Sequence, residues 1–290
     1  MRYRMHKSIK SMEIPPQELR KIQMIILEIM IEFDRICRKH GIKYSIDGGT
    51  FLGAIRHKGF IPWDPDADIV IMREDYNRFF ELCKTELDKS RFFLQDYTTD
   101  EAYRWGYARL LRKDTKYIRA GHEHMTAQNG IFMDIFTMDQ VPDNVILRKV
   151  HRFACFCIRK VLWSEVGRVV HPNVLLRMWF RLLSRIPRDT VFRFRDFVAR
   201  NNNENDETVL VRHMCSPHPK KYPYGFPKSL FRHLVDYEFE GYKFLGFEEY
   251  DWYLKSIYGD YMTPPPISER RSHIPCSSYK LTKPVFAKED

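Results

Sequence analysis

The longest regular pattern of apolar residues lies near the start of the chain and predicts an amphipathic helix. Between the Pro15-Pro16 pair and Gly41, apolar side chains recur at three- and four-residue steps, at Leu19, Ile22, Ile26, Ile29, Phe33, Ile36 and Cys37. This spacing places them on one face of a helix. A proline at the start and a glycine just past the end are the usual punctuation. We expect this helix to pack against a sheet.

Shorter patterns predict that strands and helices then follow one another. In order, they are a strand at 43–47, a glycine turn at 48–49, a helix at 50–56, a loop at 59–63 and a strand at 67–72. The two-residue period of a strand places Asp66 and Asp68 on one face and Ile69 and Ile71 on the other. Two carboxylates at the start of one strand repel each other unless a cation lies between them.

The remaining patterns indicate an α/β (α+β) fold with a mixed sheet. They predict a helix at 73–88, strands at 92–95, 105–111, 116–118 and 131–136, a strand within 239–246 and a helix at 248–258 that ends at Gly259. The strand at 131–136 is apolar except for Asp134. A carboxylate in such a run must be paired, hydrogen-bonded or metal-bound.

A basic and aromatic helical segment, residues 145–201, separates the two groups of strands. Residues 148–200 contain 13 Lys and Arg against 3 Asp and Glu, which equals the +10 excess of the whole chain. Such a mixture suits the surface of an anionic membrane. An ordinary helical insert with snorkelling arginines explains it equally well. Because the rest of the chain is balanced, nucleic acid is not an expected partner.

Composition and cysteine usage narrow the class of protein. At 290 residues and 44% hydrophobic, the chain can bury a substantial core. Without an apolar run of membrane-spanning length or a secretory signal, we expect a cytoplasmic protein, or one peripheral on the inner face of the membrane. The six cysteines are scattered, which favours reduced thiols. Cys155 and Cys157, with His151 upstream, lack the spacing of a zinc knuckle, so we interpret them as apolar-face cysteines.

Three aspartates and a glycine turn are the candidate chemistry. A D-x-D pair on one strand with a third Asp on another can hold divalent cations for phosphoryl or nucleotidyl transfer, and hard oxygen ligands suit Mg²⁺. The paired glycines let backbone N–H groups approach an anion at a helix N-terminus. Positive charge nearby would complement a diphosphate; it comes from Arg56, His57 and Lys58.

The stretch that carries these residues resembles the LicD/fukutin family of phosphotransferases. The family signature is approximately G-G-T-L-L-G-A-x-R-H-x-G-F-I-P-W-D-D-D-x-D, and residues 48–68 read G-G-T-F-L-G-A-I-R-H-K-G-F-I-P-W-D-P-D-A-D. The resemblance includes the preceding helix, M-D-I-F-x-x-D at 133–139 and Y-G-D-Y-M-x-P-P at 258–265. It therefore covers the first 140 residues and the last 50, and it implies a nucleotidyltransferase-like fold.

The resemblance implies a role for each residue of the motifs. Asp66, Asp68 and Asp134 would be the catalytic metal ligands, for Mg²⁺ or Mn²⁺. The donor phosphate would be bound by Gly48, Gly49, Thr50, Arg56, His57 and Lys58. Substrate contacts, or contacts that support the metal ligands, would come from Asp47, Asp64, Arg109 and His273. Pro65 replaces the middle Asp of the family run, which leaves the D-x-D pair intact.

Simpler roles compete for some of these residues. Asp134 could be a structural carboxylate paired with Arg109, and His57 could hydrogen-bond its own loop. A surface charge is the favoured interpretation of His273. The division expected from the resemblance is a catalytic core at 1–140, a helical insert at 141–205 and a C-terminal segment at 206–290 that packs back on the core.

The leading hypothesis, implied by the resemblance, is a metal-dependent phosphotransferase. It would move a phosphocholine-like group from a CDP-activated donor such as CDP-choline to a hydroxyl of a glycan or lipid-linked glycan. The setting would be the synthesis of cell-surface polysaccharide, teichoic acid or lipopolysaccharide. A nucleotidyltransferase acting on RNA or a small acceptor is one alternative. A non-enzymatic adaptor at the membrane surface, with residues 148–200 as its contact, is another.

Overall fold

A central mixed sheet organises the computed structural model, which describes residues 11–203, 209–215, 224–270, 272 and 274–283. Its main path runs β1-β2-β6-β4-β3, and β7 and β8 extend it from the far end of β6. Only the β2–β6 pair is parallel among the strand pairs formed by the described residues. The strands are β1 (Tyr44–Ile46), β2 (Asp68–Met72), β3 (Phe92–Gln95), β4 (Ala108–Arg112), β6 (Ile131–Gln140), β7 (Leu210–His213) and β8 (Phe226–Pro227).

Two helices cover one face of this sheet, and the apolar stripe predicts the first of them correctly. α1 spans Pro16–Lys39, and α3 spans Arg73–Glu86. Phe33 of α1 joins both neighbours, since its ring centroid lies 5.0 Å from that of Tyr44 on β1 and 4.7 Å from that of Phe79 on α3. The predicted packing of this helix against a sheet is confirmed.

α2 spans Gly48–His57, so the predicted glycine turn is the first turn of a helix. The prediction of a helix from residue 50 was therefore two residues short. Gly48 has φ +49°, a value that glycine adopts at no steric cost, and this lets the chain turn from β1 directly into α2.

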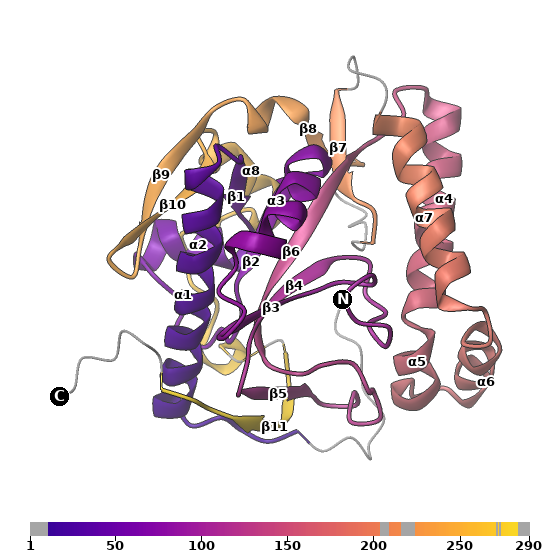
Figure 1. Cartoon of the computed structure of the whole chain (residues 1–290), viewed down its shortest axis with the longest axis horizontal. Coiled ribbons are helices and arrows are strands. Elements are labelled where there is room, and N and C mark those ends of the chain that lie inside the picture. The colour runs from indigo at the N-terminus through magenta and orange to yellow at the C-terminus, as the bar shows by residue number, and fades with distance from the viewer. Residues whose placement is uncertain (1–10, 204–208, 216–223, 271, 273, 284–290) are drawn as a thin grey trace.

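The C-terminal part of the chain folds back on α2, which Figure 1 shows at the left. It contributes a hairpin of β9 (Leu234–Phe239) and β10 (Tyr242–Phe247), followed by α8 (Tyr250–Tyr258). Phe51 of α2 packs against Tyr237 and Phe247 of the hairpin and Tyr253 of α8, with ring centroids 5.0, 6.3 and 6.0 Å away. The strand expected within 239–246 is present, but β9 was not predicted.

Smaller elements complete the core. β5 (Lys116–Arg119) pairs with β11 (Cys276–Lys280) in a separate two-stranded sheet. Two short 3₁₀ helices occupy Lys228–Phe231 and Ile267–Glu269. All six cysteines are free thiols, as the scattered spacing predicts.

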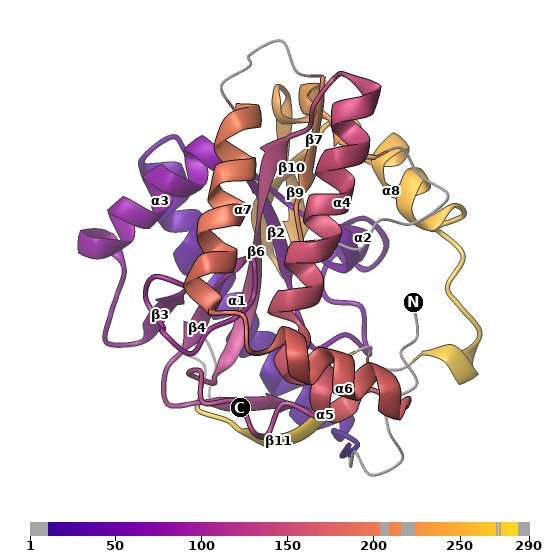
Figure 2. The ribbon, with the colours of Figure 1, turned by 90° about the vertical axis from the view of Figure 1, so that its right-hand side faces the viewer.

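The basic segment forms four helices on one side of the molecule. They are α4 (Val145–Leu162), α5 (Ser164–Val170), α6 (Val174–Leu183) and α7 (Arg188–Asn203). Figure 2 views this side and shows α4 and α7 in front of the sheet, with α5 and α6 below them. Asn144 and Asn173 cap α4 and α6 by accepting backbone N–H bonds. Within the described residues, no helix combines the length and apolar character needed to cross a bilayer.

Candidate active site

The paired aspartates lie where β2 begins, beside the third predicted aspartate. Asp68 is the first residue of β2, and Asp66 is buried in the loop just before it. Asp68 and Asp134 are register partners in the parallel β2–β6 pair, and the N–H of Asp134 donates to the carbonyl of Ala67 at 3.0 Å. Asp68 is partly exposed, whereas Asp134 is buried. The structure therefore brings the three predicted metal ligands together.

The N-terminus of α2 is tied to Asp68 through the backbone. The N–H of Asp47 donates to the carbonyl of Asp68 at 2.9 Å, and the N–H of Asp68 donates to Thr50 Oγ1 at 2.8 Å. A Cβ added to Gly48 would lie 3.7 Å from Asp68 Oδ2, and one added to Gly49 would lie 2.8 Å from Asp64 Oδ2. Because glycine has no side chain, the backbone at Gly48 and Gly49 lies close to the carboxylates of Asp68 and Asp64.

Five carboxylates share this small region, and the pKa values of two of them, Asp68 and Asp47, are raised. The pKa of Asp68 is raised well above its ordinary value by burial and by repulsion from Asp66, Asp134, Asp47 and Asp64. Burial also raises the pKa of Asp47, although its hydrogen bond from the Tyr253 hydroxyl opposes the rise. A cation bound among these groups would relieve the repulsion.

Asp134 is also held by two arginines. Arg109, its register partner on β4, donates from Nε to Oδ1 at 2.7 Å, and Arg119 of β5 lies 3.3 Å from Oδ2. Both guanidinium groups lie over the ring of Phe132, at 4.1 and 4.8 Å from its centroid. The pairing with Arg109 was foreseen as an alternative role for Asp134, whereas the contact with Arg119 was not.

The donor types at this site suit a hard divalent cation, since they are carboxylate oxygens that already repel one another. Across the part of the chain that the structure describes, no three His, Cys, Asp or Glu side chains are arranged to enclose a metal. Asp66 and Asp68 stay the predicted pair of ligands for Mg²⁺ or Mn²⁺. Asp134 faces its two arginines, and its role as a third ligand stays a prediction.

The other candidate metal group is used structurally. His151 Nδ1 lies 3.0 Å from the hydroxyl of Tyr224 and 3.7 Å from the sulfur of Cys155. Cys155 is buried in the small core of α4, whereas Cys157 is partly exposed. These contacts agree with the interpretation of Cys155 as an apolar-face cysteine.

The basic triplet lies at the opposite end of α2 from the aspartates. Because a helix rises 1.5 Å per residue, Arg56 is about 12 Å along the axis from Gly48. Arg56 donates to the carbonyl of Tyr261 at 2.8 Å, the carbonyl of Lys58 accepts from the N–H of Glu240 at 2.7 Å, and the His57 ring packs edge-on to Trp63. Burial and Arg56 lower the pKa of His57. The triplet ends the helix whose first turn lies beside the aspartates, and phosphate binding by it stays a prediction.

Two other predicted residues complete the inventory. Asp64 is buried opposite Gly49, and its loop is anchored by Gln23 of α1, whose Nε2 donates to the carbonyls of Asp64 at 3.0 Å and Ile61 at 3.2 Å. Pro65 is buried in the same loop. His273 lies outside the described residues.

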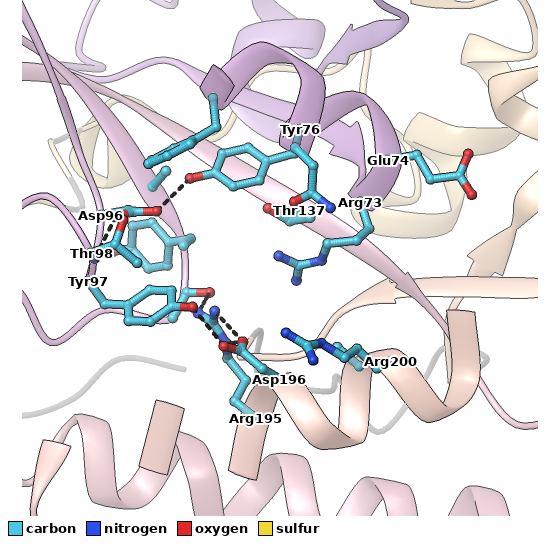
Figure 3. Close-up of a pocket in the computed structure, with 16 residues that line it drawn as sticks. Arg73, Glu74, Tyr76, Asp96, Tyr97, Thr98, Thr137, Arg195, Asp196 and Arg200 are labelled. Carbon is cyan, nitrogen blue, oxygen red and sulfur yellow. Dashed lines mark hydrogen bonds and ion pairs between the residues drawn. The ribbon is translucent and has the colours of Figure 1, made fainter. Parts of the chain in front are cut away.

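A separate cavity of about 400 Å³ lies between α3 and α7 (Figure 3). Its charged lining residues are three arginines and three acids: Arg73, Arg195, Arg200, Glu74, Asp96 and Asp196. Tyr76 donates to Asp96 at 3.0 Å, and Tyr97 donates to Asp196 at 2.7 Å. None of the predicted site residues that the structure describes lines this cavity. Ala108 of β4 and Thr137 of β6, which are close in sequence to Arg109 and Asp134, do line it. Its charged lining residues balance, so they give the cavity no net charge.

Tyr258 is a neighbour of the aspartates to which the residues alone gave no role. Its hydroxyl would lie 3.6 Å from a Cβ added to Gly48, and burial together with Asp47, Asp68, Asp64 and Asp66 raises its pKa. The signal was present in the sequence, because Tyr258 opens the Y-G-D-Y-M-x-P-P motif. Arg119 had no comparable signal.

An α/β sheet that places clustered carboxylates beside a glycine-led helix defines a group-transfer enzyme of the nucleotidyltransferase-like class. Residues 41–154 match the family described as LicD/FKTN/FKRP, nucleotidyltransferase domain. Over 269 residues the chain is 30% identical to the lipopolysaccharide cholinephosphotransferase LicD of Haemophilus influenzae, covering 88% of this chain and 95% of that protein. The chain belongs to this family and is a LicD-like phosphotransferase, which confirms the resemblance seen in the motifs.

Two further relatives match shorter stretches. An uncharacterised protein of Rickettsia typhi is 42% identical over 62 residues, which is 21% of this chain and 20% of that protein. The human ribitol 5-phosphate transferase FKRP is 44% identical over 46 residues, 16% of this chain and 9% of that protein. Membership in a phosphotransferase family favours the enzymatic interpretation over a non-enzymatic adaptor.

Proposed function

We propose that this protein transfers a phosphorylated small alcohol, phosphocholine in the first instance, from a CDP-activated donor to a hydroxyl of a glycan. One observation carries the proposal. Asp68 and Asp134 are paired on parallel strands beside the glycine-led start of α2, in a chain related over most of its length to a cholinephosphotransferase that acts on lipopolysaccharide. A cell-surface polysaccharide, a teichoic acid or a lipopolysaccharide would be the acceptor.

Residues of the site would hold the metal and bind the phosphates of the donor. Asp66 and Asp68 would hold Mg²⁺ or Mn²⁺, which supplies positive charge to the diphosphate of the donor. Backbone N–H groups at the glycine-led start of α2 would bind a phosphate of the donor. Arg109 and Arg119 keep Asp134 in place.

The transfer itself conserves atoms as follows. The acceptor hydroxyl gives its proton to an aspartate of the cluster, and its oxygen attacks the donor phosphorus that carries the alcohol. A new P–O bond to the glycan forms while the bond between the two phosphates breaks, and CMP leaves. General-base assistance of this kind contributes a factor of about 10² to 10⁴ in rate.

The test is product identification by mass spectrometry. Purified protein is incubated with CDP-choline, CDP-ribitol or CDP-glycerol, a glycan acceptor and Mg²⁺ or Mn²⁺. We expect the acceptor to gain a phospho-alcohol group from one donor, with release of CMP. The double variant Asp66→Asn, Asp68→Asn should lose transfer, while Glu81→Gln, at an exposed position of α3, should keep it.

Other products would overturn the proposal. Incorporation of nucleotide from an NTP, with steeply salt-dependent RNA binding, would support the nucleotidyltransferase alternative. Transfer by the double variant at the wild-type rate would remove the aspartates from the mechanism. We place the reaction at the inner face of the membrane, where lipid-linked glycan acceptors are assembled, and a fractionation experiment on cells tests that placement.

A further inference from the structure

α4, α6 and α7 expose many large apolar side chains, and ten of them form what we call the helical face. They include Phe153 at 67%, Leu175 at 74% and Trp179 at 54% exposure. The complete set is Ile146, Val150, Phe153, Phe156, Leu175, Met178, Trp179, Leu182, Phe194 and Phe197. An exposed apolar surface of this extent on one side of a protein marks a binding surface.

Helical spacing shows that these side chains form ordered faces. The four residues of the helical face that lie on α6, Leu175, Met178, Trp179 and Leu182, follow the i, i+3, i+4, i+7 pattern of one side of a helix. The opposite side of α6 packs against the protein, because Phe180 is buried with its ring centroid 5.0 Å from that of Trp163. On α4, Ile158 and Leu162 point inward to a small core shared with Phe192 of α7. The exposed residues are therefore additional to the core of the helices.

The three helices present their exposed sides together. α4 and α7 pack through their shared core, and both stand in the foreground of Figure 2 with α6 below them. Lys160 links α4 to α6, because its ammonium lies 5.5 Å from the ring centroid of Phe156 and 5.6 Å from that of Phe180. One flat object could contact all three helices at once.

Cations surround the apolar residues of the helical face. They are Lys149, Arg152, Lys160, Arg181, Arg185 and Arg193. Among the described residues, no ion pair connects any of these six to a carboxylate. The three acids of residues 148–200 are paired instead with Arg168, Arg188 and Arg195. The face therefore offers unneutralised positive charge next to apolar surface.

We propose that the helical face docks on the surface of an anionic lipid bilayer. Its aromatic and aliphatic side chains would enter the boundary between headgroups and acyl chains, while the six cations would contact lipid phosphates. Nucleic acid would match the charge but leave the apolar side chains exposed. A second copy of this chain would match the apolar surface but place two strongly positive faces against each other.

The longest segment outside the described residues is 1–10, and its sequence M-R-Y-R-M-H-K-S-I-K carries the same sign of charge as the helical face. Docking would hold the protein against the surface that carries a lipid-linked acceptor. The docking inference does not depend on which group the active site transfers.

Vesicle co-sedimentation tests the proposal with the full chain. We expect binding to vesicles of phosphatidylcholine mixed with phosphatidylglycerol, weaker binding to phosphatidylcholine alone, and loss of binding as salt rises. Because each basic residue near an anionic surface contributes about 1 kcal/mol, the double reversal Lys149→Glu, Arg185→Glu should weaken binding by about thirtyfold or more. The double variant Leu175→Ser, Leu182→Ser should also weaken binding.

Matched controls separate this surface from general stickiness. Ile267→Ser removes a side chain that is 81% exposed on another part of the molecule, and Lys243→Glu reverses an exposed charge on β10. Both should bind vesicles like the wild type. Circular dichroism confirms that every variant is folded. Trp179→Phe should bind normally but lose the blue shift of tryptophan fluorescence that anionic vesicles induce.

Two results would overturn the proposal. The first is equal loss of binding in the control and helical-face variants, or no binding to anionic vesicles at all. The second is a concentration-dependent dimer in sedimentation velocity that Leu175→Ser, Leu182→Ser abolishes while vesicle binding is unaffected, because the face would then join two copies of the chain.

Discussion

Asp68 of β2 and Asp134 of β6 are register partners on neighbouring parallel strands, and the N–H of Asp134 donates to the carbonyl of Ala67, the residue just before β2. This pairing joins residues that lie far apart in the sequence. Asp68 sits among four other carboxylates, whereas Asp134 is neutralised by Arg109 and Arg119. Neighbouring positions of one sheet therefore carry different electrostatic roles.

Gln23 positions the loop that carries Asp64 and Pro65. Gln23→Leu keeps the volume of this buried side chain but removes the hydrogen bonds that Gln23 donates to the carbonyls of Ile61 and Asp64. We expect a loss of stability of about 2 kcal/mol and a lower transfer rate, measured by urea denaturation and the transfer assay. Gln17→Leu, on the exposed side of the same helix, should change neither. Full activity in Gln23→Leu would contradict this role.

Gly49 is required by its distance to Asp64. A Cβ at this position would lie 2.8 Å from Asp64 Oδ2, so Gly49→Ala must displace one of the two groups. We predict a fall in transfer rate together with a stability loss of about 1 to 3 kcal/mol. Gly41→Ala is the control: Gly41 has a positive φ of +61° but open space around it. This variant should therefore lose stability through backbone strain without losing activity. Equal activity in both variants would be evidence against the close approach.

Arg109 and Arg119 should contribute unequally to the stability of the fold. Arg109 is the more buried and lies closer to Asp134. Arg109→Ala leaves the buried carboxylate of Asp134 with its ion pair to Arg119, at 3.3 Å. We therefore expect a loss of about 3 kcal/mol in the free energy of unfolding. Arg119→Ala should cost less. Denaturant unfolding of both variants decides the order, and a larger loss for Arg119→Ala would contradict this assignment.

Three histidines with lowered pKa values, His122, His151 and His213, should make the fold sensitive to acid. Burial lowers the pKa of His122 to about 3 and those of His151 and His213 to about 4. The unfolded chain binds these protons near pH 6.5, so stability should fall as pH drops from about 6.5 to 4, by up to about 3 kcal/mol for a single histidine. Unfolding of His213→Asn as a function of pH should show a shallower slope.

An exposed position provides the control for this effect. His233→Asn should reproduce the wild-type slope, since His233 is exposed between two elements of the C-terminal part. An unchanged slope in His213→Asn would show that this histidine does not carry the acid sensitivity.

Local sequence patterns predicted much of the fold because they reflect one helix or strand at a time. The apolar stripe of α1 and the alternation around β2 each report a single buried face. β9 was not predicted because it packs against α2, a helix that lies far away in the sequence. The start of α2 at Gly48 was missed because glycines usually mark a turn rather than a helix.

The candidate site was predictable to the extent that motifs carried it. Asp68 and Asp134 lie side by side because they are register partners on parallel strands, and the motifs named these residues but not the pairing of their strands. Arg119 reaches Asp134 from β5, outside the main sheet, and no local pattern announces such a contact. The separation of Arg56 from Gly48 follows from the length of α2, because eight residues of a helix rise about 12 Å.

The most direct test of the central claim is the rate of phospho-alcohol transfer by Asp68→Asn, measured in a single turnover beside Glu81→Gln. Because Asp68 is repelled by its neighbours, its replacement should leave stability unchanged or raise it while transfer falls by a factor of about 10³ or more. A folded Asp68→Asn protein that transfers the group as fast as Glu81→Gln would contradict the account.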